Sequence, residues 1–201
     1  MVVRMSAERA HEELARLREN ALGCTRCVLA RGRTQVVFGV GNPSAELMFV
    51  GEGPGREEDL QGEPFVGRSG KLLDLLMRQE IGIGREECYI ANVVKCRPPG
   101  NRDPLPAEIE ACRPYLEGQI DLIAPKVVVT LGNFATKTLL ETAEGIRRVR
   151  GRVYPFRGVH LVPTYHPAAA LRGGGEVVAE MRADFVRAKT LLRGPAMTAR
   201  S

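Results

Sequence analysis

The chain has 201 residues, of which 44% are apolar and 26% charged, an ordinary balance for a globular domain with a sizeable core. No stretch approaches the roughly 20 consecutive apolar residues of a membrane-spanning helix, and the N-terminus lacks the apolar centre of a signal peptide, so we expect a cytoplasmic protein with reduced thiols. Basic residues outnumber acidic ones by 29 to 24, and 24 of the 29 are arginine, whose planar fork suits phosphate oxygens. This charge admits nucleic acid as a partner, although a solvated surface explains a net charge of +5 equally well.

Helical and strand patterns alternate along the chain. Ser6 is a candidate N-cap for a first helix, which ends near Gly23. Apolar, β-rich runs typical of buried parallel strands follow at residues 47–50, 89–94, 127–131 and 159–162. Helical patterns lie between or after them at residues 69–79, 106–123, 133–142 and 176–192. This order predicts an α/β fold, a three-layer αβα sandwich with a central four-stranded, mainly parallel sheet.

The pattern also indicates the limits of the fold. Residues 35–38 and 152–156 are candidates for short extra strands. We expect residues 1–201 to form a single domain with its core at about 20–192, and residues 193–201 to be frayed.

Three loops leave the predicted carboxyl ends of the strands, where ligands bind in open α/β sheets. They span residues 51–70, 95–106 and 164–171. The first, GEGPGREEDLQGEPFVGRSG, contains six glycines, five carboxylates and Phe65. Glycines let a backbone approach a ligand closely, and an aromatic ring offers it a flat apolar face. The sequence therefore predicts a ligand site at this loop.

Four of the five cysteines are candidates for a metal centre. Cys24 and Cys27 form a C-x2-C pair after the first helix, and Cys96 and Cys112 enclose 15 residues with four prolines, which indicates a stiff loop. Four thiolates can hold zinc or an iron-sulfur cluster, and a redox-active or free pair is the alternative at the first two positions. The lack of a second C-x2-C favours an iron-sulfur cluster with a structural role. Cys88 fits its predicted strand as a small buried apolar residue.

His166 follows the last predicted strand. Because Pro167 disfavours helical backbone at the residue before it, His166 is expected on a turn at the strand end. A lone histidine more often packs than reacts, but this position makes His166 a functional candidate. His11 and His160 fit ordinary packing in a helix and a strand.

Four motifs, taken together with the cysteines, resemble the family 4 uracil-DNA glycosylases. They are GEGPG at 51–55, PFVGRSGKLLD at 64–74, YIANVVKCRPP at 89–99 and HPAAAL at 166–171. Their order and spacing match that family over roughly residues 20–190, and Cys24, Cys27, Cys96 and Cys112 fall where the family holds a 4Fe-4S cluster. The resemblance implies a DNA repair enzyme that flips uracil out of single- or double-stranded DNA, hydrolyses its N-glycosidic bond and leaves an abasic site.

The resemblance also implies roles for four side chains in a uracil pocket. Phe65 would stack on the base. Asn92 would accept a hydrogen bond from uracil N3–H and donate one to O4, a pattern that cytosine reverses. Glu58 would occupy the space in which a thymine methyl group would lie. His166 would donate to O2 as negative charge develops on the departing base.

The resemblance implies two further roles for the first motif, GEGPG at 51–55: activation of water and backbone contacts with uracil. Distant uracil glycosylases carry an aspartate that orients water at the position of Gly53 in this chain. Glu52 is then the catalytic candidate, and the alternative is a carboxylate bonded to nearby backbone amides. Gly51 and Gly53 are implied to bring the backbone against uracil.

DNA contacts are implied around the pocket. Leu171 and Arg172 follow the histidine motif and would wedge, from an exposed loop tip, into the gap left by the flipped base. Ser69 and Lys71 lie at a helix start whose amides would hold a phosphate. We expect a monomer.

Three rival functions remain at this level. A related class traps uracil-DNA covalently through a histidine in an inserted basic loop, but the corresponding segment here, KCRPPGNRDPLP, has neither the insertion nor a histidine. A non-catalytic, metal-stabilised nucleic-acid-binding protein would bind DNA with little regard for uracil. An electron-transfer iron-sulfur protein would leave the pocket motifs without a purpose.

Overall fold

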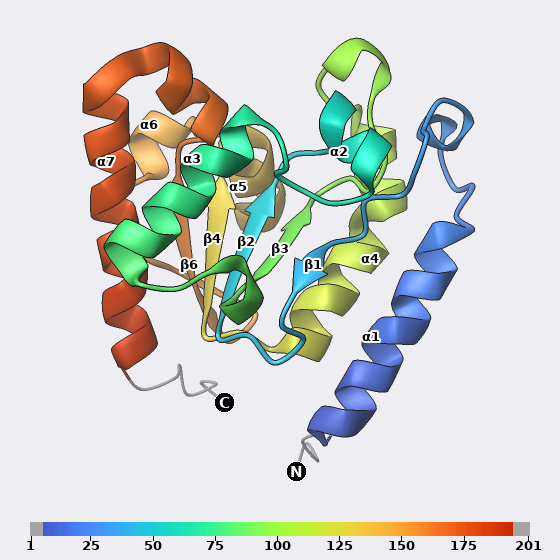
Figure 1. Ribbon diagram of the computed structural model, residues 1–201, viewed down its shortest axis with the longest axis horizontal. Coiled ribbons are helices and arrows are strands. Elements are labelled where there is room, and N and C mark those ends of the chain that lie inside the picture. The colour runs from blue at the N-terminus through green and yellow to red at the C-terminus, as the bar shows by residue number, and fades with distance from the viewer. Residues whose placement is uncertain (1–5, 195–201) are drawn as a thin grey trace.

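The computed structural model describes residues 6–194, and one six-stranded sheet lies at its centre (Figure 1). The strand order is β1-β3-β2-β4-β6-β5. The four inner strands run parallel, and they are β2 (Leu47–Gly51), β3 (Tyr89–Asn92), β4 (Val127–Leu131) and β6 (Val159–Thr164). Antiparallel strands β1 (Val40–Gly41) and β5 (Tyr154–Phe156) form the two edges. The predicted α/β class is confirmed, but the sheet has six strands rather than four.

Helices cover both faces of the sheet. The α-helices are α1 (Ala7–Leu22), α2 (Arg56–Gln61), α3 (Arg68–Leu76), α4 (Pro106–Ile123), α5 (Asn133–Leu140), α6 (Ile146–Val149) and α7 (Pro167–Arg193). Short turns of other helix types lie at Val28–Arg31, Met77–Ile81, Arg85–Glu87 and Pro99–Asn101. None of the described helices is long and apolar enough to cross a membrane.

The alternation of side chains along β2 divides the core into two layers. Leu47 and Phe49 pack with α3 and α7, whereas Met48 and Val50 pack with α1, α4 and α5. Every residue of β2 is buried because both faces of the parallel sheet are covered. This is why the strand reads as a continuous apolar run.

Several element boundaries differ from the sequence prediction, and two elements start at least five residues away from their predicted positions. The first extra strand lies at Val40–Gly41 rather than at 35–38, where Val36, Val37 and Phe38 are buried without joining the sheet. Helix α7 begins at Pro167, not at 176, because proline suits the first helical position and His166 caps the helix. Gly174 interrupts α7 with a left-handed φ of 74°, and glycines 173–175 hide the helical pattern of the first two turns. The helix reaches Arg193, and residues 195–201 of the predicted frayed tail lie outside the described residues.

The carboxyl ends of the parallel strands lie together at one end of the sheet, at the top of Figure 1. Gly51 on β2 is the register partner of Asn92 on β3, and Leu131 on β4 is the partner of Thr164 on β6. Residues that are far apart in sequence therefore leave the sheet side by side.

Candidate active site

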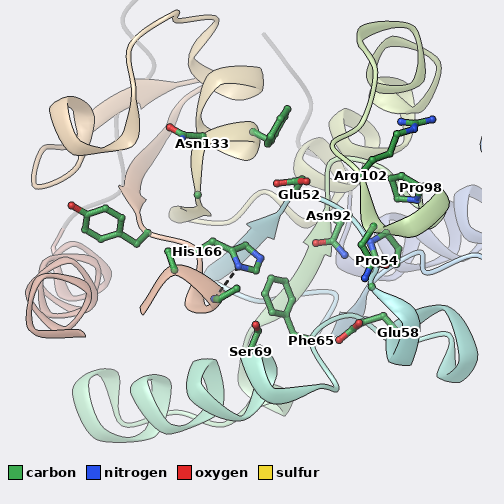
Figure 2. Close-up of a pocket in the computed structure, with 18 of the residues that line it drawn as sticks. Glu52, Pro54, Glu58, Phe65, Ser69, Asn92, Pro98, Arg102, Asn133 and His166 are labelled. Carbon is green, nitrogen blue, oxygen red and sulfur yellow. Dashed lines mark hydrogen bonds between the residues drawn. The ribbon is translucent and has the colours of Figure 1, made fainter. Parts of the chain in front are cut away.

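A pocket of about 550 Å³ opens at the carboxyl ends of the parallel strands (Figure 2). The predicted residues that line it are Glu52, Gly53, Glu58, Phe65, Ser69, Asn92, His166 and Arg172. Gly51 lies beneath it, against Asn92 and Phe65. Lys71 and Leu171 are exposed and do not line it. Leu171 and Arg172 are exposed as expected, but they lie on the first turns of α7 and not on a loop tip.

Asn92 presents an unpaired polar atom to the pocket. Its side chain is only 2% exposed, and its Oδ1 has no hydrogen-bond partner among the described residues. A Cβ at Gly51 would come within 2.5 Å of Asn92 Oδ1 and 2.6 Å of Phe65 Cζ, so glycine is needed for these two side chains to meet. A buried carbonyl oxygen without a donor is costly, so this arrangement suits a ligand that supplies an N–H.

His166 is held as a neutral imidazole by the start of α7. Its Nδ1 accepts a hydrogen bond of 3.1 Å from the backbone N–H of Ala168, which leaves Nε2 to carry the proton. Burial and, to a lesser extent, the positive charge of Arg172 lower the pKa of His166 to about 4, against a smaller opposing effect of Glu58. The ring centroids of His166 and Phe65 are 5.6 Å apart, and Figure 2 shows the two rings next to each other. The imidazole is therefore a neutral donor beside an aromatic face.

Glu52 lies above Asn92 in Figure 2. Burial raises the pKa of its carboxyl from 4.5 to about 7, and the negative charge of Asp103 adds to the shift. The same pocket thus depresses the pKa of a histidine and raises that of a glutamate. Such opposed shifts are frequent at catalytic sites.

Glu58 projects from α2 toward the loop that carries Phe65. Its Oε1 accepts hydrogen bonds from the backbone N–H groups of Val66 (3.0 Å) and Gly67 (3.1 Å), directly before α3. The carboxylate therefore already occupies amides at the start of this helix.

One wall of the pocket contains none of the residues that the sequence predicts for the site. It is formed by Gly132, Asn133, Phe134, Ile146 and Tyr165. Asn133 Oδ1 accepts a hydrogen bond of 2.8 Å from the backbone N–H of Ile146, which joins the ends of α5 and α6. The rule that ligands bind at strand ends applies equally to the loop after β4, so Asn133 was within reach of the same reasoning.

The four candidate cysteines line a second, smaller pocket between α1, α4 and the loop after β3. Two of the sulfurs accept hydrogen bonds: Cys112 Sγ from the backbone N–H of Lys95 (3.2 Å) and Cys96 Sγ from Arg33 (3.5 Å). Within residues 6–194, however, no group of three or more Cys, His, Asp or Glu side chains is arranged to hold a single metal ion. Cys88 lies in the other core layer against Met77, as expected for a small apolar residue.

Lys95 joins the two sites. Its buried Nζ donates to the backbone carbonyl of Asn92 (2.7 Å) and to Gln119 Oε1 (2.5 Å), while its backbone N–H bonds Cys112. Burial lowers the pKa of Lys95 to about 8. Lys95 lies within the motif at 89–99, but its role gave no signal in the sequence because it depends on partners from α4.

Comparisons with known proteins agree with this geometry. The family model of the Uracil DNA glycosylase superfamily matches residues 38–189, which include every residue that lines the larger pocket. The chain therefore belongs to that superfamily.

The sequence is also similar to individual members that carry the name Type-4 uracil-DNA glycosylase. That of Sulfurisphaera tokodaii is 48% identical over 168 residues, which cover 80% of this chain and 76% of the relative. That of Archaeoglobus fulgidus is 46% identical over 80% of this chain and 84% of the relative. That of Thermotoga maritima is 45% identical over 87% and 92%, respectively. Within the superfamily, the chain belongs to the type-4 group.

Proposed function

We propose that this protein is a DNA repair glycosylase that flips uracil out of DNA, hydrolyses its N-glycosidic bond and leaves an abasic site. The observation that carries the proposal is the buried Asn92 Oδ1, which has no partner among the described residues and lies beside an aromatic ring and a neutral histidine donor. Uracil supplies what these groups lack: an N3–H for Oδ1, a π face for Phe65 and an O2 acceptor for His166. Extrusion of the base costs a few kcal/mol, roughly the scale of one stacking contact.

Recognition follows from the fixed amide of Asn92. Oδ1 accepts from N3–H and Nδ2 donates to O4, so cytosine, with an unprotonated N3 and an amino group at C4, leaves polar groups unpaired. The peptide between Gly51 and Gly53 approaches the base, and Glu58 excludes the thymine methyl group from the side of α2. The bonds from Val66 and Gly67 hold the Glu58 carboxylate in place for this role.

Departure of the base leaves negative charge on the uracil ring, mostly near O2. Nε2–H of His166 stabilises that charge, and the imidazole that donates it is uncharged throughout the neutral pH range because the pKa of His166 is about 4. Glu52 orients the water that attacks the sugar. Its pKa of about 7 makes it a weak base near neutral pH, which suffices because a cationic sugar reacts readily.

The role of Glu52 predicts a pH dependence. Because only the ionised carboxylate accepts a proton, kcat/KM should rise with pH up to about 7 and then level off. The lower activity below pH 7 is caused by protonation of Glu52, because His166 is already neutral there. Glu52→Gln should lower the plateau about 100-fold and flatten the profile. Asp103→Asn should move the rising part of the pH profile to lower pH, because it removes a negative charge that raises the pKa of Glu52. Uracil release measured between pH 5.5 and 8.5 checks both variants. A Glu52→Gln protein whose kcat/KM still rises with pH as in the wild type contradicts the role of Glu52 in orienting water.

Grip on DNA comes from the rim of the pocket. Arg172 lines it, and the exposed Leu171 is the wedge for the gap in the base stack, presented by a helix. Ser69 and Lys71, on the first turn of α3, contact the phosphate backbone. We propose that the protein acts as a cytoplasmic monomer of one domain on both single- and double-stranded DNA; the five cysteines, all free within the described chain, suit a reducing compartment.

We further propose that Cys24, Cys27, Cys96 and Cys112 hold a 4Fe-4S cluster. The four residues line one pocket, and N–H donors from Lys95 and Arg33 reach two of the sulfurs, as is common around iron-sulfur clusters. A cubane of four irons spreads its thiolate ligands more widely than a single ion does, which agrees with the lack of a compact single-ion group among residues 6–194. Bound there, the cluster would supply a rigid crosslink between α1, α4 and the loop after β3.

The cysteine assignment predicts a brown protein with about four irons per chain. Cys96→Ala should bleach the visible absorption and release most of the iron. Cys88→Ala is the matched control, since it removes a buried thiol from the other core layer and should leave colour and iron unchanged. Iron and sulfide analysis decides the outcome; a colourless wild-type protein that contains one zinc overturns the cluster.

The function itself is tested with oligonucleotides that contain one uracil, followed by alkali, which cuts abasic sites. We expect strand scission at uracil in single- and double-stranded substrates and none at cytosine or thymine. The alternative is a non-catalytic, metal-stabilised nucleic-acid-binding protein, which would bind these oligonucleotides without producing scission. Absence of scission at uracil would sink the glycosylase proposal.

A further inference from the structure

The backbone of Phe65 adopts an unfavourable conformation at the centre of the pocket. Its φ of 56° lies in the left-handed region, which is uncommon for a bulky residue and persists only where the surroundings enforce it. The residue is nevertheless buried, with 5% of its surface exposed, and its ring lies between His166 and Glu58 in Figure 2. Some part of the structure must therefore hold this peptide in place.

Arg85 supplies the hold on the carbonyl side. Its guanidinium donates to the backbone oxygens of Phe65 (3.0 Å) and Pro64 (2.6 Å), and it also bonds Asp74 Oδ1 on α3 (3.0 Å). The fork of an arginine can satisfy three acceptors in one plane, which a lysine ammonium cannot reproduce. Arg85 does not line the pocket, so any influence on the base passes through Phe65.

Two other contacts complete the hold. Glu58 accepts from the N–H groups of Val66 and Gly67 on the amide side of the same turn. Gly70 packs directly on the Phe65 carbonyl, where a Cβ would overlap the oxygen. The turn is thus fixed by Glu58, Gly70 and Arg85. Of these three only Glu58 lines the pocket, and Arg85 acts on the turn through side-chain hydrogen bonds.

We infer that Arg85 is a positioning residue for base stacking: it holds the Pro64 and Phe65 carbonyls so that the Phe65 ring is in place before uracil arrives. The inference rests on the proposed uracil pocket. Pre-organisation lowers the ordering cost that the base would otherwise meet on binding. Without Arg85 the turn can leave the left-handed conformation, and part of the stacking gain is lost.

A double-mutant cycle tests whether Arg85 acts through Phe65. Arg85→Met keeps the length of the side chain but removes its charge and donors, and it should lower kcat/KM for a uracil oligonucleotide roughly 10-fold, within the roughly 5- to 150-fold range for loss of one stacking face. In a Phe65→Ala background, Arg85→Met should change kcat/KM less than about twofold, because nothing is left to position. Arg85→Lys should lie between wild type and Arg85→Met, and its effect should also vanish in that background.

The control removes a comparable ion pair far from the pocket. Arg157 bonds Asp121 (2.6 Å) at the opposite end of the sheet, so Arg157→Met should leave kcat/KM unchanged. If the losses in kcat/KM caused by Arg85→Met and by Phe65→Ala multiply in the double mutant, the positioning role is overturned and general destabilisation is indicated. An Arg85→Met protein with wild-type kcat/KM would also overturn the positioning role. If Arg85→Met does not fold, the cycle with Arg85→Lys decides in the same way. A wild-type protein that releases no uracil overturns the glycosylase proposal together with this one, whereas multiplying factors in an active enzyme overturn this one alone.

Discussion

Replacing His166 with glutamine is expected to lower kcat for uracil release about 10²- to 10³-fold, the usual effect of losing one donor to a developing oxyanion. Glutamine retains polarity and approximate size but does not place an N–H where Nε2 lies. KM for the uracil oligonucleotide should change little, because the charge on O2 develops only as the bond breaks. Single-turnover rates at saturating enzyme measure the effect directly.

The pH dependence of this loss separates a neutral donor from a charged one. Because burial lowers the pKa of His166 to about 4, the factor lost in His166→Gln should be the same at pH 6 and pH 8. A factor that shrinks as the pH rises through 6.5 would show that imidazolium is the active form. His160→Gln is the matched control, since that histidine lies within β6, away from the pocket, and its replacement should leave kcat unaltered.

Replacing Asn92 with aspartate is expected to lower kcat/KM for uracil more than about 100-fold and to reduce selectivity for uracil over cytosine. The change is isosteric, so the packing against Gly51 and Phe65 is preserved. One carboxylate oxygen still accepts from N3–H, but the other faces uracil O4 without a proton, and the buried charge adds a desolvation cost. The loss therefore reflects the hydrogen-bond pattern and not a cavity.

Competition between uracil and cytosine oligonucleotides measures this selectivity. Asn42→Asp provides the control, because Asn42 Oδ1 accepts from the backbone N–H of Ser44 near an edge of the sheet and an aspartate can accept the same bond. An unchanged uracil-over-cytosine ratio in Asn92→Asp would remove Asn92 from the recognition role.

The strand pattern illustrates what could be predicted. Leu47–Gly51 and Val127–Leu131 were visible as apolar runs because both of their faces are buried, which leaves no polar residue in the run. The edge strands were harder, since two or three residues that pair with a single neighbour carry little pattern of their own. The first turns of α7 were missed because glycines 173–175 contradict a helix locally, whereas the His166 cap and the Pro167 start support it only once β6 is known to end at Thr164.

The site divides in a similar way. Glu52, Asn92 and His166 each follow or lie at a strand end, and parallel strands bring such ends together, so their meeting in one pocket was predictable. Phe65 belongs to the long segment between β2 and α3, between the helices α2 and α3. Arg85 and Lys95 were not predictable as parts of the site, whereas Asn133 follows the end of β4, where the strand-end rule applies. Arg85 and Lys95 bond groups that are distant in sequence: the Pro64 and Phe65 carbonyls for Arg85, and the Gln119 side chain for Lys95.

The sequence by itself determined the α/β class, the order of the parallel strands along the chain, the family resemblance and the pocket candidates Glu52, Phe65, Asn92 and His166, because hydrophobic period and motif spacing are local properties. Only the tertiary structure decided the state of those residues. It revealed the oxygen of Asn92 that has no partner within residues 6–194, the opposed pKa shifts of His166 and Glu52, and the left-handed Phe65 held by Arg85. Burial, unsatisfied hydrogen bonds and backbone strain arise from contacts between distant segments, and such contacts exist only after the chain has folded.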